Sequence, residues 1–236
     1  MDGLPVSPSW WERLRAPSVW GRSVEELTLD FPAPGANGLL RPDTFIRHLR
    51  IRPAWGSDHQ KLEAVRRQNR LWLSPWEATL PPGSNELLPT AGEYRRRVER
   101  QMHDGESLVM VIEADGEVAG LVSISGVQRG AMSQGNLGYW IGQQWARQGV
   151  TSLAVAAVVD LVIGELGLHR LEINVRPENT ASLGVARRLG LRHEGLRVRY
   201  MCIAGAWADH EGFAVDAEML GEGGLVERRI VGRYQS

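Results

Sequence analysis

The residues best suited to chemistry lie between Gly138 and Ser152, where one apolar segment passes through glycines into another. The first amide groups of a helix lack intrahelical partners and point outward at the positive end of the helix dipole. Gly149, at the start of the second apolar segment, would let an anionic group approach such amides closely. The pattern therefore indicates a phosphate site, with an ordinary turn before a helix as the alternative.

Two well-known phosphate-binding motifs do not fit this stretch. No Gly-Lys-Ser or Gly-Lys-Thr triplet follows the turn, and Gly138, Gly142 and Gly149 lack the G-x-G-x-x-G spacing. Further along, Asn179 occupies a predicted helix N-cap, and Ser182 follows one turn later. Taken alone, capping and close packing explain these two residues.

Other reactive side chains are few. Cys202 is the only cysteine, which excludes an intrachain disulfide, and its apolar neighbours favour an inert core thiol. His210 and Glu211 do not extend to an H-E-x-x-H pattern, so we expect no metal site. The arginines between residues 95 and 100 predict a basic helix face, for which a solvated surface is favoured over an RNA or acidic-protein contact.

The elements that must position these residues follow from apolar patterns and turn signals. Asp115-Gly116 lies between two apolar runs and predicts a type I′ hairpin. Residues 71–76 include Pro75 and are predicted to form an aromatic loop. The predicted strands span 44–51, 107–113, 118–124, 135–141, 169–175, 192–203 and 207–220, and the predicted helices span 57–70, 92–103, 150–166 and 179–189.

This order of elements predicts an α/β (α+β) fold, a mixed sheet with helices on its faces. Residues 1–43 are rich in proline and glycine and are predicted to be an N-terminal arm. The domain is predicted to span residues 44–220, and residues 221–236 are predicted to form a loosely attached tail.

Composition indicates a soluble protein, since 43% of the 236 residues are hydrophobic and 23% are charged. No segment approaches the roughly 18 apolar residues of a membrane span, and the first 30 residues lack a signal-peptide pattern, so we expect a cytoplasmic location. The formal net charge of −1 provides no overall field to attract nucleic acid or a membrane, and we expect neither as a partner.

Several ordered motifs resemble those of the GNAT acetyltransferases, in particular the RimJ/RimL-like branch that acetylates protein N-termini. The resemblance covers about residues 44–220 and implies the GNAT fold, a central mixed, mostly antiparallel twisted sheet of about seven strands flanked by helices. It is carried by Gly138-Tyr139-Trp140-Ile141, by Arg147-Gln148-Gly149-Val150-Thr151-Ser152, and by the segments 168–172, 177–182 and 189–195.

The resemblance implies acetyl-CoA as the cofactor. In that family, a loop similar to residues 148–152 holds the CoA pyrophosphate through backbone amides, and a strand end similar to residues 140–141 pairs with the pantetheine arm. The asparagine similar to Asn179 contacts that arm, and the serine similar to Ser182 lies near the sulfur. The implied cofactor-binding residues are Trp140, Ile141, Gln148, Gly149, Val150, Thr151, Ser152, Asn179 and Ser182.

The loop departs from the family signature Q/R-x-x-G-x-G/A at two of its three defining positions, which here hold Ala146 and Thr151. Because backbone amides make most of the phosphate contacts, we expect CoA binding to survive the two changes.

Acetyl transfer needs a neutral amine, a polarised thioester carbonyl and a stabilised leaving thiolate. We predict that Ser182 protonates or hydrogen-bonds the departing sulfur. We also predict that a backbone amide near Ile141 stabilises the negative charge on the carbonyl oxygen. Glu194 is the predicted general base, acting through water, and Glu113 and Glu77 are the next candidates for this role. The alternative for Glu194 is a surface ion pair with an arginine.

Tyr200 is a second candidate acid, with core packing as its alternative. In the family layout Trp72, Trp76, Glu77 and Glu113 line the acceptor side, and the tryptophans alone are equally explained by packing. The segment 207–210 resembles the family's last strand, where we expect structural hydrogen bonds.

The predicted acceptor is the α-amine of a protein N-terminus. An α-amine has a pKa of about 8 and a lysine side chain a pKa of about 10.4, so a site with a weak general base is better suited to the α-amine. A small-molecule amine is the enzymatic alternative, and a non-catalytic CoA-sensing module is the alternative from another class. A homodimer is left open.

Overall fold

The computed structural model describes residues 18–32 and 40–227, so parts of the predicted arm and tail lie outside the described residues. The strands are β1 Ser18–Val19, β2 Arg22–Ser23, β3 Leu29–Pro32, β4 His48–Pro53, β5 Leu108–Ala114, β6 Glu117–Gln128, β7 Gln134–Ile141, β8 Arg170–Val175, β9 Arg192–Ile203 and β10 Ala206–Asp216. The helices are α2 Asp58–Gln68, α3 Arg70–Leu73, η2 Ser74–Trp76, α4 Ala91–His103, η3 Gln143–Trp145, α5 Val150–Val159, η4 Asp160–Glu165, α6 Thr180–Leu189 and α7 Ala217–Leu220.

One sheet organises the described chain, with eight strands in the order β3-β4-β5-β6-β7-β8-β10-β9. Every neighbouring pair is antiparallel except β7 and β8, which run parallel. The predicted mixed, mostly antiparallel sheet is therefore confirmed. The eighth strand is β3, which pairs with β4 at one edge although it falls within the predicted arm.

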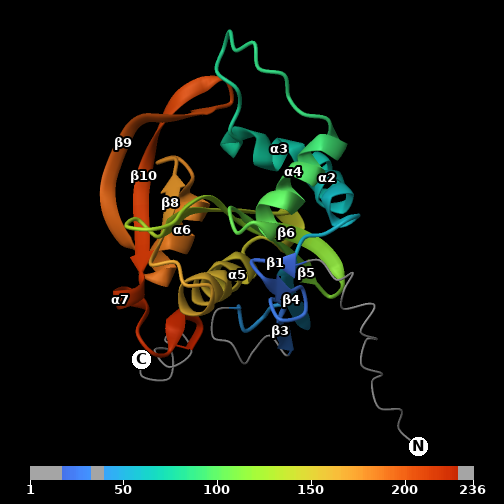
Figure 1. The fold of residues 1–236 in the computed structure, drawn as a ribbon, viewed down its shortest axis with the longest axis vertical. Helices are drawn as coiled ribbons and strands as arrows, with labels where there is room; N and C mark the ends of the chain where they lie inside the picture. Colours follow the sequence, from blue (N-terminus) through green and yellow to red (C-terminus); the bar gives the residue numbers. More distant parts are fainter. Residues whose placement is uncertain (1–17, 33–39, 228–236) are drawn as a thin grey trace, which may run out of the picture.

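Helices cover both faces of this sheet (Figure 1). On β5, Val109 and Val111 pack around Leu62 of α2, whereas Met110 and Ile112 belong to the main core with α5. Because successive strand residues point to opposite faces, α2 and α5 lie on opposite sides of the sheet. Every residue of α5 except Thr151 is buried, as expected for a helix with an apolar surface all round.

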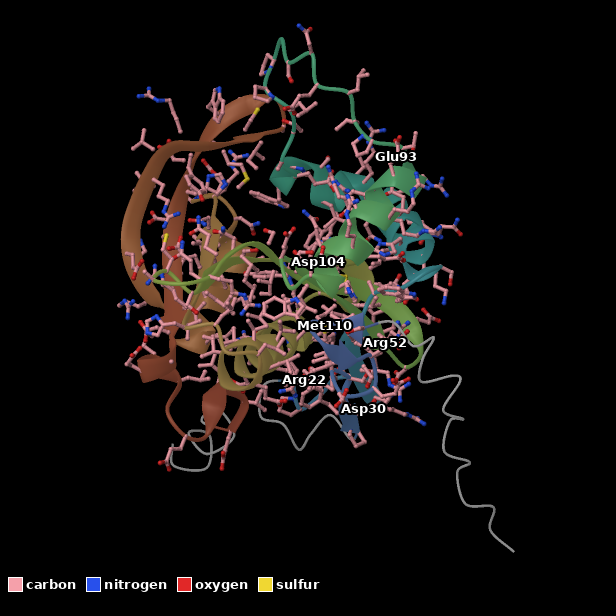
Figure 2. The ribbon with its side chains drawn as sticks, in the orientation of Figure 1. Arg22, Asp30, Arg52, Glu93, Asp104 and Met110 are labelled. Carbon is pink, nitrogen blue, oxygen red and sulfur yellow. The ribbon has the colours of Figure 1, made fainter. Side chains whose placement is uncertain are left out.

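Short-range turn signals were confirmed. Asp115 and Gly116 join β5 to β6 with φ values of 50° and 84°, as a type I′ turn requires. The start of α4 carries a capping box between Thr90 and Glu93, and Figure 2 shows Glu93 at that helix end.

Three predicted elements were wrong in detail. Residues 71–76 form the short helices α3 and η2 rather than a loop, because Pro75 sits in the first turn of η2, where no amide donor is needed. The last strand ends at Asp216, not residue 220, because its carboxylate accepts the amide of Met219 at 2.9 Å and starts α7. The helix predicted over 150–166 changes to a π-helix at Asp160.

No helix within the described ranges is long and apolar enough to cross a membrane. The same residues include no group of three or more His, Cys, Asp or Glu side chains that could hold a metal ion.

Candidate functional site

The parallel strands β7 and β8 separate partway along their length. Their pairing ends at Asn136 and Glu172, whereas β7 stays paired with β6 as far as Ile141 and β8 stays paired with β10 as far as Val175. The second half of β7 therefore faces a gap in the middle of the sheet. Backbone N–H and C=O groups need partners, so such a gap can accept an extended ligand.

A cavity of about 360 Å³ lies at this gap. Four of the predicted site residues line it together, namely Trp76, Asn179, Ser182 and Tyr200. The remaining lining residues are Ser125, Asn136, Leu137, Gly138, Tyr139, Ile173, Asn174, Val175, Arg176, Met201 and His210.

Asn179 and Ser182 are fixed at the cavity wall by hydrogen bonds. The side-chain oxygen of Asn179 accepts the amide of Ser182 at 3.0 Å, which confirms the predicted N-cap of α6. The carbonyl of Ser182 accepts the hydroxyl of Tyr139 at 3.3 Å. Burial raises the pKa of Tyr139 to about 12, so this hydroxyl stays protonated and remains a donor.

The predicted phosphate loop leads into the start of α5. Gly149 is the N-cap residue, with φ 88° and ψ −8°, a left-handed conformation that glycine adopts at little cost. The carbonyl of Gln148 accepts the amide of Arg41 at 3.0 Å, and this hydrogen bond connects the loop to the segment around residue 41. Within the described part of the chain no side chain caps α5, so the amides of residues 150–152 remain available to an anion.

The side chains of Trp140 and Ile141 point away from the cavity lining. Trp140 packs beside Leu62 of α2, and Ile141 is buried in the main core. The indole N–H of Trp72 donates to the carbonyl of Ile141 at 3.0 Å, so Trp72 braces the end of β7 instead of lining the acceptor side. Any contact from residues 140 and 141 to a cofactor must come from their backbone.

Two predicted acidic residues lie outside the cavity. Glu77 pairs with Arg66 at 2.6 Å, and Glu113 pairs with Arg52 at 2.6 Å. Arg52 also holds Asp58 at 2.6 Å, and Figure 2 shows Arg52 on the side of the molecule away from β9 and β10. The carboxylates of Glu77 and Glu113 form ion pairs, and neither lies at the gap between β7 and β8.

The geometry does not support Glu194 as the general base. Its carboxylate pairs with Arg170 and, at 2.9 Å, with Arg192, as the predicted ion-pair alternative requires. These two guanidinium groups, Arg170 foremost, lower the pKa of Glu194 to about 2. A carboxylate held in this way has little basicity near neutral pH, and it does not line the cavity.

The Glu194 ion pairs predict a pH-dependent stability. A folded-state pKa of about 2, below the ordinary value of 4.5, stabilises the fold above pH 4.5, and this contribution is lost as the pH falls towards 2. Glu194→Gln should therefore lower the urea midpoint at pH 7, and its difference from the wild type should shrink by pH 3. Glu165→Gln, at an exposed ion pair with Arg22, is the control. If the urea midpoints of Glu194→Gln and the wild type differ equally at pH 7 and pH 3, the ion pairs of Glu194 do not account for the lost stability.

His210 is a cavity residue for which only structural hydrogen bonds were predicted. It lies on β10, is 3% exposed and contacts the ring of Tyr200 edge-on, with ring centres 5.6 Å apart. The sequence offers only a lone histidine beside an apolar run, which a core histidine would show equally. Only the pairing of β10 with β8 brings it to the gap.

The mouth of the cavity is held by contacts from distant segments. Arg176 donates to the carbonyl of Pro75 at 3.2 Å, and its guanidinium lies 5.8 Å from the centre of the Trp76 ring. Next in the chain, Thr79 donates its amide to the carbonyl of Cys202 at 3.0 Å. Cys202 is 3% exposed, so the predicted core thiol is buried.

The chain is similar to proteins of known family. Residues 48–192 match the acetyltransferase (GNAT) domain model. The [ribosomal protein uS5]-alanine N-acetyltransferase of Escherichia coli K12 is 29% identical over 168 residues, which cover 70% of this chain and 83% of that protein. The probable N-acetyltransferase YjcK of Bacillus subtilis 168 is 33% identical over 125 residues, covering 52% and 67% of the two chains.

A solved structure shows a similar arrangement over most of the chain. Mycobacterium smegmatis RimJ, determined in complex with CoA-disulfide, superposes with a TM-score of 0.73 and is 28% identical. The match covers 88% of this chain and 94% of that one.

Proposed function

The chain belongs to the acetyltransferase (GNAT) family of acetyl-CoA-dependent enzymes, and we propose that it acetylates the N-terminal α-amine of a protein. The observation that carries this proposal is the cavity at the β7–β8 gap, because it joins Asn179 and Ser182 to Trp76 and Tyr200. Asn179 and Ser182 were predicted to contact the cofactor, Trp76 to contact the acceptor and Tyr200 to act as an acid. The thioester and the amine can react only if these residues line the same cavity.

The residues present fit coenzyme A. The uncapped start of α5 at Gly149 suits a pyrophosphate, which would accept hydrogen bonds from amides of residues 150–152. The backbone of residues 137–141, unpaired with β8, suits the amide groups of a pantetheine arm. Asn179 and Ser182 lie farther along the same path, at the wall of the cavity.

The acceptor side fits a neutral α-amine better than a lysine. No Asp or Glu is among the described residues that line the cavity, so no carboxylate stabilises a lysine ammonium there. Deprotonating a lysine at neutral pH costs about 3 kcal/mol more than deprotonating an α-amine. The similar proteins include an enzyme named as an alanine N-acetyltransferase of ribosomal protein uS5, and a similar acceptor would put the reaction in the cytoplasm.

Trp76 at the cavity and the segment that follows it expose apolar side chains, which we propose contact a polypeptide acceptor. Trp76 is 38% exposed, and the segment that follows it carries Leu87 and Leu88, which are 95% and 78% exposed. In Figure 1 this segment arches from η2 to α4 at the top of the molecule. These side chains offer apolar contacts to residues beyond the N-terminal amine.

In the reaction the amine nitrogen attacks the thioester carbonyl carbon, a C–N bond forms, and the C–S bond breaks. A backbone amide of β7 near Ile141 would stabilise the carbonyl oxygen, and Ser182 would donate a hydrogen bond to the departing thiolate. Tyr200 lines the same cavity and is a second candidate donor to the sulfur.

The test compares three acceptors with acetyl-CoA: a peptide with an unblocked alanine N-terminus, the same peptide with its α-amine blocked and a lysine unblocked, and alanine amide as a small amine. We expect thiol release with the first, and mass spectrometry should locate the acetyl group on the α-amine. Preferential acetylation of the lysine or of alanine amide would overturn the proposed acceptor. Binding of CoA, seen as a thermal shift, without turnover of any amine would favour the sensing module instead.

Ser182→Ala should lower kcat about 10-fold to 100-fold while leaving the Kd for CoA within about twofold, because a hydrogen bond to a charged group contributes about 1.5–3 kcal/mol. Thr180→Ala is the matched control, since Thr180 begins the same helix but is exposed and does not line the cavity. An unchanged kcat in the Ser182 variant would remove this residue from the leaving-group role.

A further inference from the structure

We propose that His210 is the general base that accepts the proton lost by the acceptor amine. This assignment rests on the proposed acetyl transfer and adds to it the residue that completes the proton balance. As the C–N bond forms, the amine proton moves to the imidazole, and the electron pair of the C–S bond leaves with the sulfur. The imidazolium then returns its proton to solvent or to the thiolate, so that the enzyme ends the cycle unchanged.

The composition of the cavity wall singles out His210. The described residues of the wall include no carboxylate, and Arg176 is a cation with no lone pair to offer. Tyr139 donates its hydroxyl proton to the Ser182 carbonyl, and its raised pKa keeps it protonated. Of the described residues that line the cavity, His210 alone carries a basic nitrogen in its neutral form.

The tautomer of His210 is set by its own strand. The Nδ1 atom lies 3.0 Å from the carbonyl oxygen of Ala208, and a carbonyl can only accept, so Nδ1 must carry the hydrogen. The Nε2 atom consequently holds the lone pair of the neutral ring, on the side that is not engaged with the Ala208 carbonyl. The ring of Tyr200 packs edge-on against the imidazole. The arrangement leaves one basic nitrogen ready to accept a proton.

The charges around His210 come from several elements. Arg176 follows β8 and disfavours the imidazolium, whereas Glu178 and Asp209 favour it. On β9, Arg197 is the register partner of His210, and its guanidinium is held by Glu172 at 2.6 Å. Burial is the largest influence and lowers the pKa of His210, so the ring is neutral at pH 7 and able to take a proton.

The test compares His210→Gln with the wild type on the peptide that carries an unblocked α-amine. We expect kcat/KM to fall about 10²-fold to 10⁴-fold, the range of general base catalysis, with the Kd for CoA within about twofold. His193→Gln is the matched control, because His193 is an exposed histidine on β9 that pairs with Glu211 outside the cavity. We expect that control to retain wild-type activity.

A second variant separates proton transfer from support of the fold. His210→Ala should recover activity when imidazole is added, and across a series of substituted imidazoles the recovered rate should rise with the basicity of the added base. A residue that only supports the cavity would give rescue that does not depend on basicity. That outcome, or a His210→Gln variant within threefold of the wild type, would overturn the assignment to His210 and leave the proposed function standing. A wild-type chain that acetylates no amine would instead overturn the proposed function, and this role with it.

Discussion

Gly149→Asp is expected to raise the Kd for CoA on the order of 100-fold. Two unit negative charges about 5 Å apart repel by about 3 kcal/mol at an effective dielectric constant of about 20, and 1.4 kcal/mol corresponds to a tenfold change in affinity. Gly149 is the N-cap of α5, so a carboxylate at this position would compete with the pyrophosphate for the same amides. Isothermal titration with CoA measures the effect.

Gly149→Asn is the control for that experiment, because asparagine has nearly the shape of aspartate but no charge. Asparagine also tolerates the left-handed conformation that residue 149 adopts, with φ 88°. We expect the asparagine variant to bind CoA within about tenfold of the wild type. Equal loss of affinity in both variants would show that backbone strain, and not charge beside the phosphates, accounts for the effect. Wild-type affinity in the aspartate variant would rule out the start of α5 as the phosphate site.

Gly120→Ala is expected to lower the free energy of unfolding by about 3 kcal/mol and to weaken CoA binding. A Cβ atom at residue 120 would lie 2.2 Å from the carbonyl oxygen of Trp140 and 2.9 Å from the Cα of Ile141. Both neighbours are backbone atoms of β7, so the strand itself must move to make room. The displaced segment is the part of β7 that continues beyond its pairing with β8.

Gly184→Ala is the control of opposite sign. Gly184 lies inside α6, and a Cβ atom there would meet nothing within 4 Å. Alanine in a helix interior is more stable than glycine by about 0.5–1 kcal/mol, so this variant should be slightly more stable than the wild type. Urea unfolding measures both variants. A Gly120→Ala protein as stable as the wild type would mean that β6 and β7 do not approach this closely.

The two glycines act on different parts of one binding path. Gly149 governs where the negative charge of the cofactor is held, and Gly120 governs where the end of β7 lies. The first variant should therefore lose affinity through charge, with a stability loss no larger than that of Gly149→Asn, and the second should lose both affinity and stability.

Much of the fold followed from local patterns in the chain. The Asp115-Gly116 turn, the cap at Asn179 and the buried helix after Gly149 depend on backbone conformation and hydrogen bonds within a few residues. Such features are encoded by neighbouring residue types, so a sequence displays them directly. The ends of elements were less accurate, as the premature end of β10 at Asp216 shows, because a single side-chain hydrogen bond decided that boundary.

The acceptor side of the site was predicted only in part: Trp76 and Tyr200 were candidates with packing as their alternative, whereas Arg176 and His210 were not predicted to act there. His210, Tyr200, Arg176 and Trp76 come from four separate elements or loops, and only the order of strands in the sheet unites them. The predicted base, Glu194, has the right chemistry but lies between Arg170 and Arg192, which hold its charge in place. Long-range ion pairs of this kind leave no periodic trace in the sequence.

By itself, then, the sequence determined the class of fold, the glycine turn that can receive a phosphate, and the capped helix that presents Ser182. Tertiary structure decided which ionisable groups reach the gap between β7 and β8: His210 lines the cavity there, and Glu194 does not. The physical reason is that turns and caps are fixed by contacts between near neighbours, whereas the basicity of a side chain depends on every charge and buried surface that folding brings beside it.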